Sequence, residues 1–247
     1  MTSAERPELP RYLALLWNRE PATPRRGPKP TLAISDIARA AVAIADESGW
    51  DAVSMKGIAD ALGVTTMSLY RYVDAKDDIH TIMIDEAFGR ADPATTATGD
   101  WRTRVGNWVR AAAELMRRRP WIAEIPLSSP PLGPNTLSWT NSGVHAFADT
   151  GLSGQQKLSA LLLVDGFVRH HVRQAHQMGL LTAGAVAGRP GYPELLAELA
   201  DPGDYPDLAA AGAGMEPDDD FFTDQLEFGL GILLDGIAGL IQAEKRR

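Results

Sequence analysis

The stretch AVAIADESGWDAVSMKGIADALGVTTMSLYRYVDAKDDIHTIM, residues 41–83, decides the fold expected for this chain of 247 residues. Its apolar residues recur every three or four positions, which is the spacing of one helical face. Gly49 and Gly63 interrupt the pattern, and glycine readily ends a helix. Residues suited to begin helices are Ser35, Ser54, Thr65 and Asp74. We therefore predict helices at about 35–48, 55–62, 66–72 and 76–88.

The second and third of these helices are joined by a tight turn at Gly63 and Val64, as in a helix-turn-helix unit. The third helix turns Leu69 and Val73 inward and leaves small polar, aromatic and basic side chains outside. A short helix with such a surface suits the major groove of DNA. The outward side chains are those of Thr66, Met67, Ser68, Tyr70 and Arg71.

The outward residue types match the chemistry of DNA recognition. The hydroxyls of Thr66 and Ser68 can bond base edges or phosphates, and Met67 can meet a thymine methyl group. Arg71 can reach guanine or a phosphate. Tyr72 has two open interpretations, because its hydroxyl can face DNA or its ring can pack against the first helix.

The ordered residues Leu62-Gly63-Val64, Ser68-Leu69-Tyr70 and Lys76 resemble the DNA-binding domain of the TetR family. The resemblance implies phosphate contacts by Tyr70 and Lys76, and a base or phosphate contact by Lys56. It places Thr66, Met67 and Ser68 in the groove. The expected DNA-contact residues are Lys56, Thr65, Thr66, Met67, Ser68, Tyr70, Arg71, Tyr72 and Lys76.

Charge is unevenly distributed along this acidic chain, whose formal net charge is -8. Residues 31–90 hold more acidic than basic residues, so DNA affinity must depend on a few well-positioned contacts. Residues 1–30 are basic and include the proline-rich segment PATPRRGPKP, which predicts a flexible arm. Arg25, Arg26 and Lys29 either add phosphate or minor-groove contacts or belong to a solubilising tail.

Several classes of protein are not expected from this sequence. There are no cysteines, and the sequence contains no P-loop, dinucleotide fingerprint, HExxH or nucleophile elbow, so we expect no enzyme. His170, His171 and His176 lack the i, i+4 spacing of a helical metal site, so we expect no metal and no other cofactor. No secretory signal or apolar run of roughly 20 residues is found, which predicts a cytoplasmic protein without a membrane partner.

The second half of the sequence again shows helical periodicity and no strand-like alternation. We predict an all-α fold with three parts: an arm at 1–30, a three-helix helix-turn-helix DNA-binding domain with a connecting fourth helix at 31–90, and a larger helical domain at 91–247. A long loop at 182–220 is expected to hold one short helix at 193–199. The helices expected in the larger domain are 101–118, 135–149, 153–178 and 221–243.

The final helix, FFTDQLEFGLGILLDGIAGLI at 221–241, resembles the end of the C-terminal domain of the tetracycline repressor, chiefly at Phe228-Gly229-Leu230 and Leu234-Asp235-Gly236. Its apolar surface and glycines favour a helix interface, with the 153–178 helix as partner in a four-helix bundle of two subunits. The alternative is that both are core helices of a monomer. The expected homodimer contacts are Leu161, Phe167, Phe228, Leu230, Leu234 and Ile237.

The resemblance also implies a pocket for a small-molecule effector in the larger domain. Core packing is the alternative role for every candidate. The candidates are Trp108, Trp139, His145, Phe167 and His170, with Trp121 and Phe147 as further members. We expect a sequence-specific transcriptional regulator, a repressor that a ligand releases from a two-fold operator by moving the 76–88 helix. The alternative is a regulator whose larger domain binds a protein or only dimerises.

Overall fold

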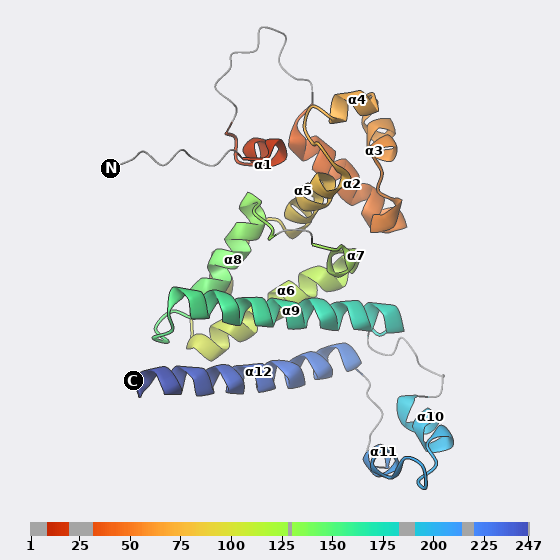
Figure 1. Ribbon diagram of the computed structural model, residues 1–247, viewed down its shortest axis with the longest axis vertical. Coiled ribbons are helices and arrows are strands. Elements are labelled where there is room, and N and C mark those ends of the chain that lie inside the picture. Colours follow the sequence, from red (N-terminus) through yellow and green to blue (C-terminus); the bar gives the residue numbers. More distant parts are fainter. Residues whose placement is uncertain (1–8, 20–31, 128–129, 183–190, 214–219, 247) are drawn as a thin grey trace.

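The computed structural model describes residues 9–19, 32–127, 130–182, 191–213 and 220–246. Within these ranges every regular element is a helix, which confirms the all-α fold. Figure 1 shows two layers of the chain: a compact N-terminal group of helices, and a lower group in which α9 and α12 run side by side.

Besides the short helix α1 (Arg11–Leu16), the N-terminal group contains four helices and a short 3₁₀ turn. These are α2 (Ile34–Ser48), η1 (Trp50–Ala52), α3 (Met55–Leu62), α4 (Thr66–Leu69) and α5 (Lys76–Phe88). Ile37, Ile58, Leu69 and Ile82 are fully buried between them. The periodicity of the apolar residues therefore predicted both the helices and the core that they share.

Two of the four expected helix starts need correction. Ser54 does cap α3, because its hydroxyl accepts from the N–H of Gly57 at 3.0 Å. Ser35 lies inside α2, which Asp36 caps by accepting from the N–H of Ala33 at 2.8 Å. Asp74 lies before the start of α5, where Asp78 is the side chain that accepts from the backbone.

Helix α4 is shorter than the expected 66–72 segment. After Leu69 the backbone tightens, and Tyr72 N–H donates to the Leu69 carbonyl at 2.8 Å instead of one residue further back. Such i to i−3 bonds are typical of a 3₁₀-like final turn. Tyr70, Arg71 and Tyr72 therefore follow the helix in a turn.

A helix also lies where the sequence predicted only a flexible arm. Helix α1 (Arg11–Leu16) packs on α2 and α5, with Tyr12 and Leu13 buried. The expectation of a flexible arm is therefore wrong for the segment that contains α1. Arg25, Arg26 and Lys29 lie outside the described residues.

The larger domain continues from η2 (Pro93–Thr96) through seven helices among the described residues, most of which pack around one core. In order they are α6 (Trp101–Arg118), α7 (Trp121–Glu124), α8 (Pro134–Ala146), α9 (Gly154–Met178), α10 (Tyr192–Leu199), α11 (Pro206–Gly212) and α12 (Phe221–Lys245). Helices α10 and α11 pack on each other and stand away from the body (Figure 1). The expected long loop thus holds two helices within its described part.

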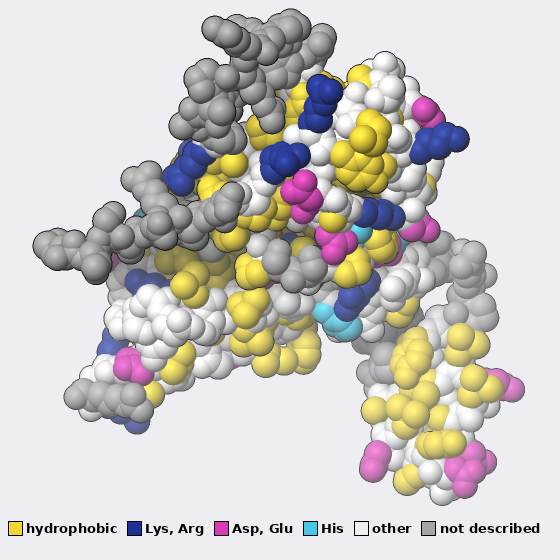
Figure 2. Space-filling model, turned by 45° about the horizontal axis from the view of Figure 1, so that its top comes forward, with side chains coloured by type: hydrophobic (Ala, Val, Ile, Leu, Met, Phe, Trp, Pro, Cys, Tyr) yellow, Lys and Arg dark blue, Asp and Glu magenta, His cyan; other side chains and the backbone are white. Residues whose placement is uncertain are grey.

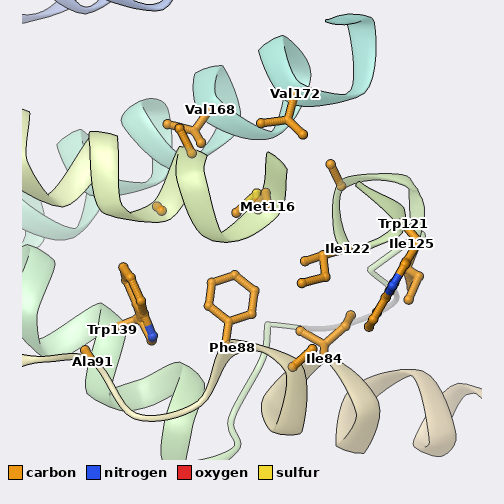
Figure 3. Packing of buried hydrophobic residues seen from close by; sticks show 14 of the residues in the cluster. Ile84, Phe88, Ala91, Met116, Trp121, Ile122, Ile125, Trp139, Val168 and Val172 are labelled. Atoms are coloured by element: carbon orange, nitrogen blue, oxygen red, sulfur yellow. The ribbon is translucent and has the colours of Figure 1, made fainter. Parts of the chain in front are cut away.

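The two helical groups share a continuous apolar core. Figure 3 shows Phe88 pointing from the end of α5 into the larger domain, between Trp139 on α8 and Ile122 on α7. The Phe88 and Trp139 rings meet edge to face at 5.8 Å. Because α5 ends inside the core of the larger domain, a rearrangement there can displace the N-terminal group of helices.

Candidate DNA interface and effector cavity

The candidate DNA-facing surface is built by α3, α4 and the first turn of α5. Leu69 is fully buried and fixes α4 on the domain core, so the opposite side of α4 faces outward. Met67 is 72% exposed and Tyr70 46% exposed. Thr66 and Ser68 are half-buried, and Lys56, Thr65, Arg71 and Lys76 are exposed. These side chains are accessible to a partner, and their individual DNA contacts remain expectations.

Tyr72 is positioned differently from the other expected contacts. Its hydroxyl donates to the backbone carbonyl of Leu32 at 2.6 Å, and its ring is partly buried. The hydroxyl is therefore already engaged in holding the segment before α2. We remove Tyr72 from the DNA-contact set, in favour of the packing interpretation.

Cations are scattered on this surface. Figure 2 shows separate dark blue side chains with magenta ones between them, without a continuous basic area. Asp60, Asp74 and Asp77 are exposed near the expected contacts. This distribution agrees with the excess of acids in residues 31–90, and it makes each exposed lysine or arginine important for affinity.

A cavity of about 760 Å³ lies where the larger domain meets α2 and α5. Its lining residues are Asp46, Ala87, Ala111, Glu114, Leu115, Arg118, Arg119, Pro120, Trp121 and Trp139. Asp46 comes from α2 of the N-terminal group, whereas Glu114 and Trp139 come from α6 and α8 of the larger domain. A molecule in this cavity would therefore touch both domains.

The cavity wall contains a polar contact between the domains. The Asp46 carboxylate accepts from Arg119 Nε at 3.1 Å and from Trp121 Nε1 at 2.8 Å. Arg119 also donates to the Ala87 carbonyl at the end of α5. Glu114 accepts from Arg117 and Arg118, each at 2.8 Å, and these hydrogen bonds, that of Arg117 first, lower its pKa. The wall thus combines two indole rings with paired charges.

Of the expected effector residues, Trp139 and the further candidate Trp121 line this cavity, whereas Phe147 is fully buried and is not part of its lining. Trp108 is buried and donates through Nε1 to the Trp139 carbonyl at 3.0 Å. His145 and His170 are exposed on the surface, and Phe167 packs between α9 and α12. Trp108, His145, Phe167 and His170 are therefore not part of the cavity lining. The sequence offered no signal for Asp46 or Arg119, because their proximity depends on tertiary packing.

Asp85 is a buried carboxylate that the sequence did not single out. It projects from α5 to the start of α8, where it accepts from the Thr136 N–H at 2.8 Å and the Thr136 hydroxyl at 3.0 Å. Burial raises its pKa, and the hydrogen bonds from Thr136 and Asn135 act in the opposite direction. Asp85 thereby joins the helix that connects the domains to the helix that carries Trp139.

An exposed apolar surface runs along α9 and α12. Leu162 is 73% exposed and Phe228 is 68% exposed, and Ile232 and Leu158 extend the same kind of surface. Of the expected dimer contacts, Phe228 is available to a partner. Leu161, Leu230, Leu234 and Ile237 are buried inside the subunit, because they fill the space between α9, α12 and their neighbours. We reassign these four to the core of the subunit.

The geometry can be compared with known proteins. Residues 37–80 match the model of bacterial regulatory proteins of the tetR family, and residues 92–241 match the tetracyclin repressor-like C-terminal domain. The second match alone spans more than half of the chain. This chain belongs to the TetR family. It is a transcriptional regulator with an N-terminal helix-turn-helix DNA-binding domain.

Relatives of this TetR protein include regulators and solved structures. The HTH-type transcriptional repressor DrrR1 of Streptomyces coeruleorubidus is 34% identical over 97% of this chain and 88% of that protein. A possible TetR family regulator from Streptomyces coelicolor A3(2) is 30% identical, with a TM-score of 0.64 over 83% of this chain and 98% of that one. ActR of Streptomyces coelicolor, solved with actinorhodin, shares the fold at 22% identity, with a TM-score of 0.71 over 85% and 99%.

Two further structural findings bear on the expected absences. Among the described residues, no group of three or more histidine, aspartate or glutamate side chains is placed to hold a metal ion. Of the described helices, α12 is long and apolar enough to cross a membrane by length and composition alone. In this TetR fold, α12 packs against α9 and α6, which accounts for part of its apolar character.

Proposed function

We propose that this TetR protein is a homodimeric repressor that leaves a two-fold operator when a small molecule enters the 760 Å³ cavity. The observation that carries the proposal is the position of the cavity, whose wall includes residues from both the DNA-binding and the larger domain. A ligand bound there acts on the domain junction directly. We further propose that the protein is cytoplasmic, is not an enzyme and needs no cofactor.

The DNA side of the proposal rests on accessible side chains of α3, α4 and α5. Lys76 and Tyr70 contact phosphates, and Lys56, Thr66, Met67 and Ser68 face the groove. Phosphate contacts give affinity without sequence preference, whereas contacts to base edges discriminate between sequences. Thr65 and Arg71 complete the proposed set.

The dimer side of the proposal rests on the exposed apolar surface of α9 and α12. Its side chains are those of Leu158, Leu162, Phe228 and Ile232. Burying them against a second copy makes a four-helix bundle and sets two reading helices at a fixed separation. A single copy of α4 would read too few base pairs to be specific.

Release follows if the ligand favours a domain arrangement that does not fit the operator. The Asp46 contact with Arg119 and Trp121 lies in the cavity wall, so a bound molecule changes the contacts that hold the domains together. Planar molecules with polar substituents suit a wall of two indole rings and paired charges. No observation favours the alternative of a larger domain that only dimerises or binds a protein.

A ligand screen on the intact dimer tests the effector proposal. Actinorhodin, the ligand in the ActR structure, and a library of planar metabolites are tested for a rise in Tm and for release of bound operator DNA. A hit should lose its effect in Ala111→Phe, which fills the cavity, while this variant still binds the operator. A hit that acts equally on Ala111→Phe would place the effector elsewhere.

A further inference from the structure

We propose that α1 positions α4, the DNA-reading helix. We also propose that α1 links α4 to the larger domain through side-chain hydrogen bonds, in addition to the covalent link that α5 provides. The inference rests on the proposed DNA contacts of α4 and goes beyond them. Two hydrogen bonds at opposite ends of α1 carry it: Arg11 reaches the end of α4, and Trp17 reaches the start of α8.

The body of α1 is fixed on the DNA-binding domain. Tyr12 and Leu13 are buried, with Leu13 only 4% exposed, and α1 contacts both α2 and α5. Because α1 has only six residues, its position depends on this packing. This packing therefore sets where the groups at the two ends of α1 lie.

At the first end, Arg11 stabilises the turn that follows α4. Its Nη1 donates to the Tyr70 carbonyl at 3.1 Å and lies 3.7 Å from Asp74 Oδ1. A cation at the end of a helix satisfies free carbonyls and opposes the partial negative charge there. Tyr70 belongs to the proposed phosphate contacts, so Arg11 holds the backbone of a DNA-contact residue without needing to touch DNA.

At the second end, Trp17 reaches the larger domain. Its Nε1 donates to the Leu132 carbonyl at 2.9 Å, immediately before Gly133, the residue that precedes α8. Helix α8 carries Trp139, which lines the cavity. The same end of α8 is held to α5 by Asp85 through Thr136.

Together these contacts form a continuous connection from the cavity wall to the reading helix. A displacement of α8 pulls on Trp17 and tilts α1 about its buried residues Tyr12 and Leu13, and this tilt shifts the Tyr70 carbonyl through Arg11. Helix α5 provides a parallel route through its own backbone. Movement of α8 can therefore reach the end of α4 through α1 as well as through α5.

A double-mutant cycle on the full-length dimer tests this connection without requiring the effector. Trp17→Phe, Arg11→Gln and the double variant are titrated with the duplex that the parent protein selects from a random pool. Removal of one hydrogen bond should weaken operator binding by about three- to tenfold for either single variant. In the double variant, Trp17→Phe should add less than about 1.5-fold, because its effect passes through Arg11.

Matched controls distinguish positioning from general damage. Trp101→Phe changes a half-buried tryptophan on α6, and Arg39→Gln changes an exposed arginine on α2 that pairs with Asp36. Both should leave operator affinity unchanged. Hydrogen exchange of residues 65–73 should rise in Trp17→Phe and in Arg11→Gln, while Tm of both variants stays within a few degrees of the parent.

Three results would overturn the connection. These are an unchanged operator affinity in Trp17→Phe, effects of the two substitutions that multiply, or unchanged exchange of residues 65–73 in both single variants. If these variants unfold, Trp17→His and Arg11→Lys are used instead, because both keep an N–H donor. Each of them must then retain part of the parent's operator affinity. If the parent enriches no duplex at all, the proposed function fails and not merely the role of α1.

Discussion

Each cation on the DNA-facing surface has acidic neighbours, so individual lysines and arginines determine whether DNA is attracted. Lys76 is the first residue of α5, and Asp77 follows it directly. Lys56 is exposed on α3, one turn before Asp60. A surface with so few bases cannot rely on general attraction, and the effect of removing one base should be easy to measure.

Replacing Lys76 with glutamine should weaken binding to all DNA sequences by a similar factor. Loss of one phosphate contact should reduce the slope of log K against log salt by about 0.9. The measurement is a fluorescence titration at several salt concentrations. Lys245→Gln, at the far end of α12, is the matched control. An unchanged slope in Lys76→Gln would remove Lys76 from the phosphate contacts.

Thr66 and Tyr72 should respond in opposite ways although both carry hydroxyls. Thr66→Ala should alter the preferred base at one position by about 1 to 3 kcal/mol. Tyr72→Phe should leave base preference unchanged and lower the free energy of unfolding by about 1 kcal/mol, because its hydroxyl bonds the Leu32 carbonyl. Competition binding with mutated duplexes and urea denaturation separate the two outcomes. A changed base preference in Tyr72→Phe would return this residue to the DNA contacts.

The sequence could predict which residues of α4 are outward but not which hydroxyl is already engaged. Leu69 and Val73 mark the inner side of the helix by their spacing alone. The partner of Tyr72 is a backbone carbonyl 40 residues away, and a backbone group leaves no side-chain pattern to read. For the same reason the cavity residue Asp46 could not be assigned before the packing of α7 was known.

At the scale of helices, α9 and α12 are held by a close approach at one glycine. A Cβ at Gly229 would collide with the ring of Phe167, whereas one at Gly236 would meet nothing within 4 Å inside the subunit. Both glycines lie in the helix, where alanine is otherwise the better residue. Substitution of Gly229 therefore tests packing within a subunit, whereas substitution of Gly236 affects only contacts that another subunit would make.

Gly229→Ala should lower stability, and Gly236→Ala should not lower the stability of an isolated subunit. We expect a loss of about 1 to 3 kcal/mol for Gly229→Ala from overpacking. Urea denaturation across a range of protein concentrations gives both values. Equal losses for the two variants at low concentration would contradict the proposed contact of Phe167 with Gly229.

His171 is a buried histidine at the junction of α9 and α12. Its Nε2 lies 2.8 Å from the Phe222 carbonyl, and burial lowers its pKa, although the hydrogen bond to Phe222 acts in the opposite direction. Burial also lowers the pKa of His80 on α5. Below the ordinary histidine pKa of about 6.5, the unfolded chain therefore binds more protons than the folded one, and stability falls as pH drops.

His171→Gln should flatten this dependence, because glutamine keeps an N–H donor but does not titrate. The free energy of unfolding should fall less between about pH 6.5 and 5 than in the parent. His145→Gln, an exposed histidine on α8, is the control and should keep the parent slope. A parent-like slope in His171→Gln would exclude His171 as the source.

Helix existence was predictable where apolar periodicity was long, as in α2, α6, α9 and α12. Helix α1 was not, because six residues between prolines and arginines show too little periodicity. Its burial depends on α2 and α5, which lie far along the chain. Helix α11 was missed for a related reason, since its alanine-rich surface acquires a partner only when α10 forms.

For the whole molecule, the proposed function requires two copies. The apolar surface of α9 and α12 remains exposed in one subunit, and DNA specificity requires a second reading helix. The dimer contacts expected from the sequence were mostly core residues, because the last helix carries apolar residues on more than one side and periodicity alone could not tell the inner side from the outer side. The exposed fractions of the side chains in the folded chain distinguish the inner side of this helix from its outer side.

Leu162→Glu should convert the dimer to a monomer and abolish operator binding. A charge at a side chain that is 73% exposed costs little in the subunit but much in a buried interface. Leu199→Glu, at a 75% exposed leucine on α10, is the matched control and should remain dimeric. Sedimentation equilibrium reports the mass. A dimeric Leu162→Glu protein with full operator affinity would place the interface on another surface.

The most direct test of a dimeric, sequence-reading regulator is selection of bound DNA from a random pool, with the protein-to-DNA ratio measured on the selected duplex. The structure predicts enrichment of a two-fold symmetric site that holds whole dimers. The same selection with Leu162→Glu should enrich nothing. Enrichment of a single asymmetric half-site that one subunit occupies, or failure of the parent to enrich any sequence, would contradict the proposed function.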